Sequence, residues 1–142
     1  MEKTVIQMEA LLGKTIPNLE IPTVDEQRMK TMAALLRDPY PVHWDKDANK
    51  VLGIGEKVIN QGPLNLSYIV NMLIHWQGPT CIRRLKAKFL KPVFGGDNVV
   101  AGGKVIEIID SSSSRVLCEI WLKRGNETVL SGEAEVTITN QE

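Results

Sequence analysis

The spacing of apolar residues along the chain predicts helices in its first half and strands in its second half. Within residues 23–36, apolar residues recur every three or four positions, which is typical of a helix with one apolar face. Thr23 is the expected N-cap of this helix, and Pro39 lies just beyond it, where proline prevents its continuation. The preceding segment, 15–22, places apolar residues between prolines and favours a short edge strand.

Two weaker signals complete the first half of the chain. Residues 1–14 are compatible with a short helix or an irregular arm. Asp45 is a suitable N-cap for a second, short helix that extends to about Leu52, and Gly53 closes it. Residues 53–62 then form a loop.

The most apolar stretch follows Pro63, a residue type that favours the first turn of a helix. Residues 64–76 are apolar on most of the helical circumference, which predicts a helix buried on nearly all sides. Ser67 and Asn71 are four residues apart and share its one polar stripe. A Gly-Pro pair ends this helix.

Beyond the Gly-Pro pair the apolar period changes to two, which is the period of a β-strand. Turn-forming residues separate the segments with this period, which favours an antiparallel meander. Gly102 and Gly103 mark a bulge or a bend within the second strand. The four expected strands lie at 82–90, 97–110, 116–123 and 133–138.

This order of elements predicts one α+β domain over residues 1–142. A helix as apolar as the one at 63–77 does not lie on a surface, so the simplest packing wraps a strongly curved antiparallel sheet around it. That arrangement is a hot-dog fold. A single sheet of this kind keeps an exposed edge and an uncovered face, so at least a dimer is expected.

Composition narrows the class of protein. The chain has 142 residues with 17 basic and 17 acidic side chains, and this balance argues against a nucleic-acid or membrane-surface protein. No apolar run is long enough to span a bilayer, and the first residues do not have the pattern of a signal peptide. Cys81 and Cys118 belong to no metal or redox motif, so we interpret them as buried thiols of a cytoplasmic protein.

The candidate catalytic side chains lie in residues 37–45, with the sequence Arg-Asp-Pro-Tyr-Pro-Val-His-Trp-Asp. Its two prolines favour a rigid, extended bend after the first long helix. Such a bend can direct the Asp38 carboxylate and the His43 imidazole into one space, where an acid/base pair can transfer protons to a bound substrate. The alternative from these residues alone is a proline-rich surface turn with an ordinary histidine.

Three segments resemble the MaoC-like, (R)-specific enoyl-CoA hydratase family. Residues 37–45 resemble its motif Gly-Asp-x-Asn-Pro-Leu-His-x-Asp, and Gln-Gly-Pro-Leu-Asn-Leu-Ser at 61–67 resembles the His-Gly-Met-Leu segment that opens its central helix. Residues 89–97 resemble its Phe-x-x-Pro-Val-x-x-Gly-Asp turn. The amino-acid sequence of the central helix also resembles that of the short subunits of actinobacterial steroid side-chain dehydratases.

The resemblance implies reversible hydration of a trans-2-enoyl-CoA to a 3-hydroxyacyl-CoA. Asp38 and His43 would activate the water and exchange the proton at the α-carbon, and the Gly62 backbone N–H would polarise the thioester carbonyl. The position of Gly62 supports this role independently, because free N–H groups and the dipole at a helix N-terminus favour an oxyanion. No metal or redox cofactor is expected, because the acid/base pair and the oxyanion donor together can carry most of the catalysis.

The surroundings of the motif depart from the family pattern. Arg37 stands where the family has Gly, Tyr40 where it has Asn, and Gln61 where it has His. We expect Tyr40, Gln61, Ser67 and Asn71 to bind the substrate; for Ser67 the alternative is a hydroxyl that bonds back to its own helix.

Two other functions stay open at this point. The departures at positions 37, 40 and 61 fit a non-catalytic or half-site subunit that needs a second MaoC-like chain. A hot-dog acyl-CoA thioesterase would share the fold and the thioester-polarising helix terminus. The expected partners are an acyl-CoA and either an identical or a different MaoC-like chain, with no nucleic acid and no membrane.

Overall fold

A computed structural model describes residues 7–139 of the protein. In chain order its elements are β1 (Thr15–Ile21), α2 (Glu26–Leu36), the single-turn helix η1 (Pro41–His43), α3 (Lys46–Val51), α4 (Gly62–Gln77), β2 (Ile82–Phe89), β3 (Val99–Asp110), β4 (Arg115–Arg124) and β5 (Glu127–Thr137). Of the predicted arm at 1–14, residues 7–9 are helical, and 1–6 lie outside the described residues.

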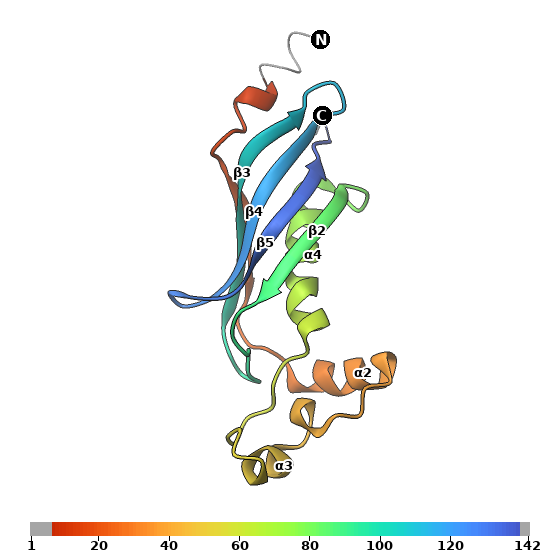
Figure 1. Ribbon diagram of the computed structural model, residues 1–142, viewed down its shortest axis with the longest axis vertical. Helices are drawn as coiled ribbons and strands as arrows, with labels where there is room; N and C mark the ends of the chain where they lie inside the picture. The colour runs from red at the N-terminus through yellow and green to blue at the C-terminus, as the bar shows by residue number, and fades with distance from the viewer. Residues whose placement is uncertain (1–6, 140–142) are drawn as a thin grey trace.

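The five strands form one antiparallel sheet in the order β1-β3-β4-β5-β2. The sheet curves along one side of α4, while α2 and α3 form a lobe beyond its lower end (Figure 1). The predicted edge strand is therefore confirmed as β1. The predicted meander is confirmed for β3 to β5 and is wrong for β2, which pairs with β5 at the other edge of the sheet and does not pair with β3. The lobe lies next to the N-terminus of α4, so the proline-rich bend and the start of the central helix come together.

The core lies between the sheet and α4. On β4, Cys118 and Ile120 are fully buried while Glu119 between them is exposed, as the period of two predicts. Ile69 and Leu73 of α4 are also fully buried and belong to the same apolar cluster. Burial of these side chains drives the sheet to curve around the helix.

The helix α4 is covered on one side only, which corrects the prediction that it is buried on nearly all sides. Its side chains toward the sheet, such as Ile69 and Met72, are buried, whereas Asn71 and His75 are exposed. The five-stranded sheet lies along one side of the helix (Figure 1). No helix within residues 7–139 is long and apolar enough to cross a membrane.

The first long helix starts later than predicted. Its N-cap is Asp25, whose carboxylate accepts a hydrogen bond from the Gln27 N–H at 2.8 Å, and not Thr23. The reason is that Val24 N–H donates to the Asp97 carbonyl at 2.8 Å, which holds the chain extended until Asp25.

Gly102 and Gly103 permit close packing, and the irregularity that they predict lies on the neighbouring strand. The register between β1 and β3 shifts between Ile16 and Leu19, opposite the two glycines. A Cβ atom on Gly102 would lie 2.5 Å from Nε1 of Trp121, and one on Gly103 would lie 2.8 Å from Cδ1 of Ile16. Side chains at these two positions would therefore force the strands apart.

Candidate active site

The proline-rich bend begins where α2 ends. Arg37 adopts a left-handed conformation with φ of 52°, and its N–H donates to the Ala34 carbonyl. The Asp38 N–H donates to the Ala33 carbonyl at 2.9 Å. The end of α2 thus fixes the backbone of Asp38 before the first proline.

Replacing Arg37 with glycine is expected to raise the free energy of unfolding by about 1 kcal/mol, because a left-handed conformation costs a residue with a Cβ roughly this amount. Denaturant unfolding monitored by circular dichroism measures the change. Lys30→Gly, at an exposed position inside the same helix, is the control and should lower stability by a similar amount. An unchanged or lowered stability of Arg37→Gly would contradict this account of the turn.

The bend brings Asp38 and His43 together. Nε2 of His43 lies 3.9 Å from Oδ2 of Asp38. Nδ1 of His43 lies 2.7 Å from the carbonyl oxygen of Ile59, which can only accept a hydrogen bond. A neutral His43 therefore carries its proton on Nδ1 and presents the lone pair of Nε2 to Asp38.

The gap between the two groups has the size of a water site. A distance of 3.9 Å is too long for a direct hydrogen bond, but one water molecule can donate to both acceptors across it. The other oxygen of Asp38 accepts the Tyr40 N–H at 3.2 Å, which orients the carboxylate. The His43 side chain is 15% exposed and that of Asp38 is 44% exposed, so the pair is open to solvent from the Asp38 side.

Two further side chains brace the bend. Asn49 of α3 is fully buried, and its amide donates to the carbonyls of Val42 and Lys57 at 3.0 and 2.9 Å. The indole N–H of Trp44 donates to the Pro39 carbonyl at 3.1 Å. Sequence reasoning missed the role of Asn49, because a polar residue inside a short helix normally faces solvent. Asp45 caps α3 as predicted.

Gly62 is the first residue of α4. The first hydrogen bond inside the helix runs from Asn65 N–H to the Gln61 carbonyl, and Pro63 has no N–H. The Gly62 N–H has no acceptor among residues 7–139, so it is available to an oxyanion at the positive end of the helix dipole. A Cβ atom on Gly62 would lie 3.2 Å from the ring of Phe89.

Comparison with known protein families matches residues 8–119 to the MaoC like domain. The match covers more than half of the chain and includes the bend, Gly62 and the first strands of the sheet. The chain belongs to the MaoC-like family. No curated protein sequence matches it.

Solved structures of similar fold agree with this assignment. The R-hydratase PhaJ1 from Pseudomonas aeruginosa has a TM-score of 0.81 at 23% identity, covering 92% of this chain and 83% of that one. An (R)-hydratase from A. caviae involved in PHA biosynthesis has a TM-score of 0.77 at 25% identity, covering 90% and 96%. The ChsH1-ChsH2 complex from Mycobacterium tuberculosis has a TM-score of 0.77 at 17% identity, covering 90% and 98%. The predicted α+β hot-dog fold is confirmed.

The residues predicted to bind substrate in this MaoC-like chain lie in different surroundings. Tyr40 is 54% exposed, and its ring stands edge-on to that of His43 at 6.3 Å between centroids. Gln61 is 1% exposed, and its amide donates to the Met29 carbonyl at 2.8 Å, so it faces α2.

Of the two residues on α4 predicted to bind substrate, Ser67 is partly buried and Asn71 is exposed. The hydroxyl of Ser67 bonds back to the Leu64 carbonyl at 2.7 Å, which is the alternative that the sequence left open. Asn71 lies one turn further along on the exposed side of the helix. Contact between these residues and a substrate stays a prediction.

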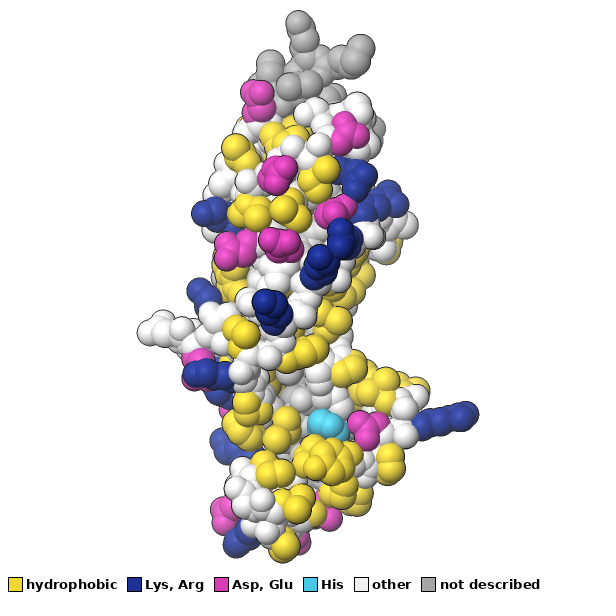
Figure 2. Space-filling view, in the orientation of Figure 1, with side chains coloured by type: hydrophobic (Ala, Val, Ile, Leu, Met, Phe, Trp, Pro, Cys, Tyr) yellow, Lys and Arg dark blue, Asp and Glu magenta, His cyan; other side chains and the backbone are white. Residues whose placement is uncertain are grey.

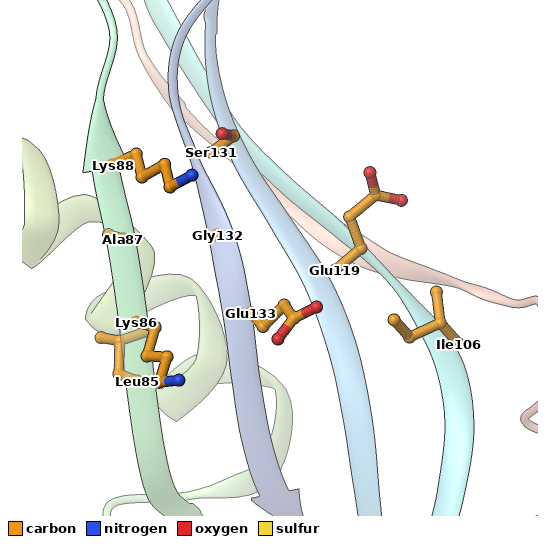
Figure 3. Close-up of a pocket in the computed structure, with 9 residues that line it drawn as sticks. All are labelled: Leu85, Lys86, Ala87, Lys88, Ile106, Glu119, Ser131, Gly132 and Glu133. Carbon is orange, nitrogen blue, oxygen red and sulfur yellow. The ribbon is translucent and has the colours of Figure 1, made fainter.

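A large groove lies elsewhere, on the face of the sheet turned away from α4 (Figure 3). Its volume is about 870 Å³, and charged side chains of β2, β4 and β5 line much of it: Lys86, Lys88, Glu119 and Glu133. None of the predicted site residues lines it. The groove is a solvated outer surface, and the candidate active site is the bend beside the start of α4.

Proposed function

We propose that this MaoC-like protein adds water reversibly to a trans-2-enoyl-CoA and forms a 3-hydroxyacyl-CoA. The observation that carries the proposal is the 3.9 Å gap between Asp38 and His43, with the imidazole tautomer set by Ile59. Membership of the MaoC-like family and the fold shared with two R-hydratases support it.

The geometry suggests how the reaction proceeds. A water molecule donates one hydrogen bond to Asp38 and one to Nε2 of His43, and loses a proton to the pair as its oxygen bonds to the β-carbon. Negative charge moves to the thioester oxygen, where the N–H of Gly62 stabilises it. The pair then returns a proton to the α-carbon, so the elements of one water molecule are added and the site is restored.

Apolar side chains surround the pair on the lobe formed by α2, η1 and α3. In Figure 2 they gather over the lower part of the molecule, where this lobe lies. Leu36, Tyr40 and Trp44 are between 43% and 54% exposed, although large apolar side chains usually avoid water. We propose that the acyl part of the substrate is large and apolar and packs against this surface.

The chain is proposed to act as an assembly with a second MaoC-like chain, identical or different. The exposed side of α4 and the free edge of β2 are surfaces that a second hot-dog domain can cover. The similarity to a chain of the ChsH1-ChsH2 complex supports this proposal. Light scattering of the purified protein distinguishes a homodimer from a monomer that needs another chain.

The test is a panel of trans-2-enoyl-CoAs, from short straight chains to bulky ring systems, incubated with the purified protein. Loss of the enoyl-thioester absorbance without release of free CoA thiol supports hydration, and the preferred member names the acyl class. Thiol release identifies a thioesterase and excludes the proposal. No reaction with any member, in a protein that is folded, favours the half-site subunit.

The protein's own thiols are expected not to react with the thiol reagent in this assay. Cys81 and Cys118 are fully buried, and burial raises the pKa of Cys81. The pKa of Cys118 is raised to about 12, mainly by burial and to a smaller extent by the nearby Cys81. The reactive species is the thiolate, so a thiol reagent should modify neither side chain in the native protein and both after denaturation. Rapid modification of either cysteine without denaturant would contradict this burial.

A further inference from the structure

We propose that Asp97 is a positioning residue, which with Arg124 locks the loop at 93–97 and thereby fixes the geometry of Asp38 and His43. Its kinetic consequence rests on the proposed function, whereas its structural consequence can be measured without any substrate. The loop is far from the bend in sequence. It contacts residues 58–60, which hold the His43 ring, and the start of α2, which leads to Asp38.

The first contact is with residues 58–60, which form an extended segment between the bend and the loop. Ile59 uses both of its backbone groups toward the bend: its N–H donates to the Val42 carbonyl at 2.9 Å, and its carbonyl accepts Nδ1 of His43 at 2.7 Å. The neighbouring residues, Val58 and Asn60, direct backbone groups to the loop at 93–97 instead. The Asn60 N–H donates to the Val93 carbonyl at 2.7 Å.

On the other side of Ile59, the carbonyl of Val58 accepts the Gly95 N–H at 2.9 Å. This alternation is the hydrogen-bond pattern of a central β-strand, and Ile59 and Phe94 form a β-bridge. A displacement of the loop is therefore transmitted directly to the carbonyl that sets the tautomer of His43.

The second contact is with the start of α2. Val24 N–H donates to the Asp97 carbonyl at 2.8 Å, and the Gly96 N–H donates to the Val24 carbonyl at 2.9 Å. The helix that begins just after Val24 ends at Leu36, immediately before the bend that carries Asp38. One loop thus supports the carboxylate through α2 and the imidazole through residues 58–60.

The Asp97 carboxylate holds this loop in shape. Its Oδ2 atom accepts the Phe94 N–H at 2.9 Å and Nη1 of Arg124 at 2.6 Å. The side chain of Asp97 is only 11% exposed, and a charge-assisted hydrogen bond in such a site is stronger than one between neutral groups. Without this carboxylate the loop would lose the side-chain acceptor that joins the Phe94 N–H to Arg124.

Arg124 is itself held on several sides. Its guanidinium donates to the Pro92 carbonyl at 3.1 Å and lies 5.7 Å from the centre of the Phe94 ring, and Glu127 accepts from its other nitrogen. The hydrogen bond to Asp97 raises the pKa of Arg124. The Asp97–Arg124 pair fastens the loop to the hairpin between β4 and β5.

The test exploits the fact that the chain has two histidines. Nitrogen NMR of isotope-labelled histidine reads the tautomer of His43, with the exposed His75 as an internal reference. The wild type should show one tautomer of His43 with the proton on Nδ1. In Asp97→Asn this proton should exchange with solvent at least about tenfold faster and a second tautomer should appear, because the hydrogen bond to Ile59 opens more often.

The matched control is Glu135→Gln, which removes the charge from another carboxylate that binds an arginine. Glu135 is 21% exposed and accepts Nη2 of Arg115 at 2.6 Å. It lies near the C-terminal end of β5, and this end of the strand points away from the lobe (Figure 1). The His43 signals of this variant should match those of the wild type. If Asp97→Asn does not fold, the same measurements are made on Arg124→Lys. This variant keeps the positive charge but loses the planar set of N–H donors with which arginine binds two acceptors at once.

Kinetics supply the second readout. In Asp97→Asn, kcat should fall about 10- to 100-fold with KM changed less than about twofold, since a small misplacement of reacting groups lowers the rate and not the affinity. Unchanged His43 signals in a folded variant would overturn the positioning role, whatever its activity. If the wild type turns over no enoyl-CoA, the proposed function fails, and the NMR comparison still decides the role of Asp97.

Discussion

Replacing Asp38 with asparagine is expected to lower kcat by about 10²- to 10⁴-fold, the usual contribution of a positioned acid/base. Asparagine cannot take up a proton, and its amide can donate to Nε2 of His43 in place of the water. The fold should survive, because the Asp38 side chain is 44% exposed and its backbone contact with Ala33 does not involve the carboxyl group. Steady-state kinetics and circular dichroism measure the two effects.

The same motif supplies the control for this variant. Asp45 caps α3 by accepting the N–H groups of Asp47 and Ala48, and asparagine is an equally good N-cap. Asp45→Asn should therefore retain wild-type turnover and stability. Full activity in Asp38→Asn, or an equal loss in both variants, would show that Asp38 has no specific role in the chemistry.

Replacing Gly62 with proline is expected to lower kcat by about 10²- to 10³-fold, because it removes the only atom of this residue that can donate to the thioester oxygen. Two features favour proline at this position: Gln61 has φ of −61° and ψ of 144°, which suits a residue before proline, and proline favours the first turn of a helix. The measurement is kcat with the preferred enoyl-CoA.

Gly62→Ala is the matched variant that keeps the N–H. The three atoms nearest to its methyl group belong to the ring of Phe89, which is 56% exposed and can move by a few tenths of an ångström. Its kcat should stay within about tenfold of the wild type. Equal losses in the proline and alanine variants would attribute the effect to crowding and would remove the oxyanion role of the Gly62 N–H.

The parts of the fold that follow local rules could be predicted from the sequence. The change of apolar period near residue 79 gave the order of helices and strands, and Asp45 was identified as a cap from its position. The N-cap of α2 could not be predicted, since the contact of Val24 with Asp97 that delays the helix joins residues far apart in sequence. For the same reason the open side of α4 is visible only once the sheet is built.

Some features of the candidate site could likewise be predicted from the sequence, and others could not. Residue type and spacing gave Asp38 and His43 only as a possible pair, and the family resemblance gave their roles and that of Gly62. The structure brings Asp38 and His43 within reach of one water molecule. Backbone groups leave no trace in a sequence, so the Ile59 carbonyl that orients His43 could not be found. Gln61 looked like a binding residue because it precedes Gly62, but its side chain is buried against α2.

The most direct test of the central claim is the mass of the product formed in water labelled with heavy oxygen. The purified protein is given the preferred trans-2-enoyl-CoA, with Asp38→Asn beside it, and the acyl-CoA species are separated and weighed. The wild type should add one labelled oxygen to the β-carbon and leave the thioester intact, while the variant should form this product at least about 10²-fold more slowly. A labelled oxygen in a released carboxylic acid, or the same labelled product at the same rate from both proteins, would contradict this claim.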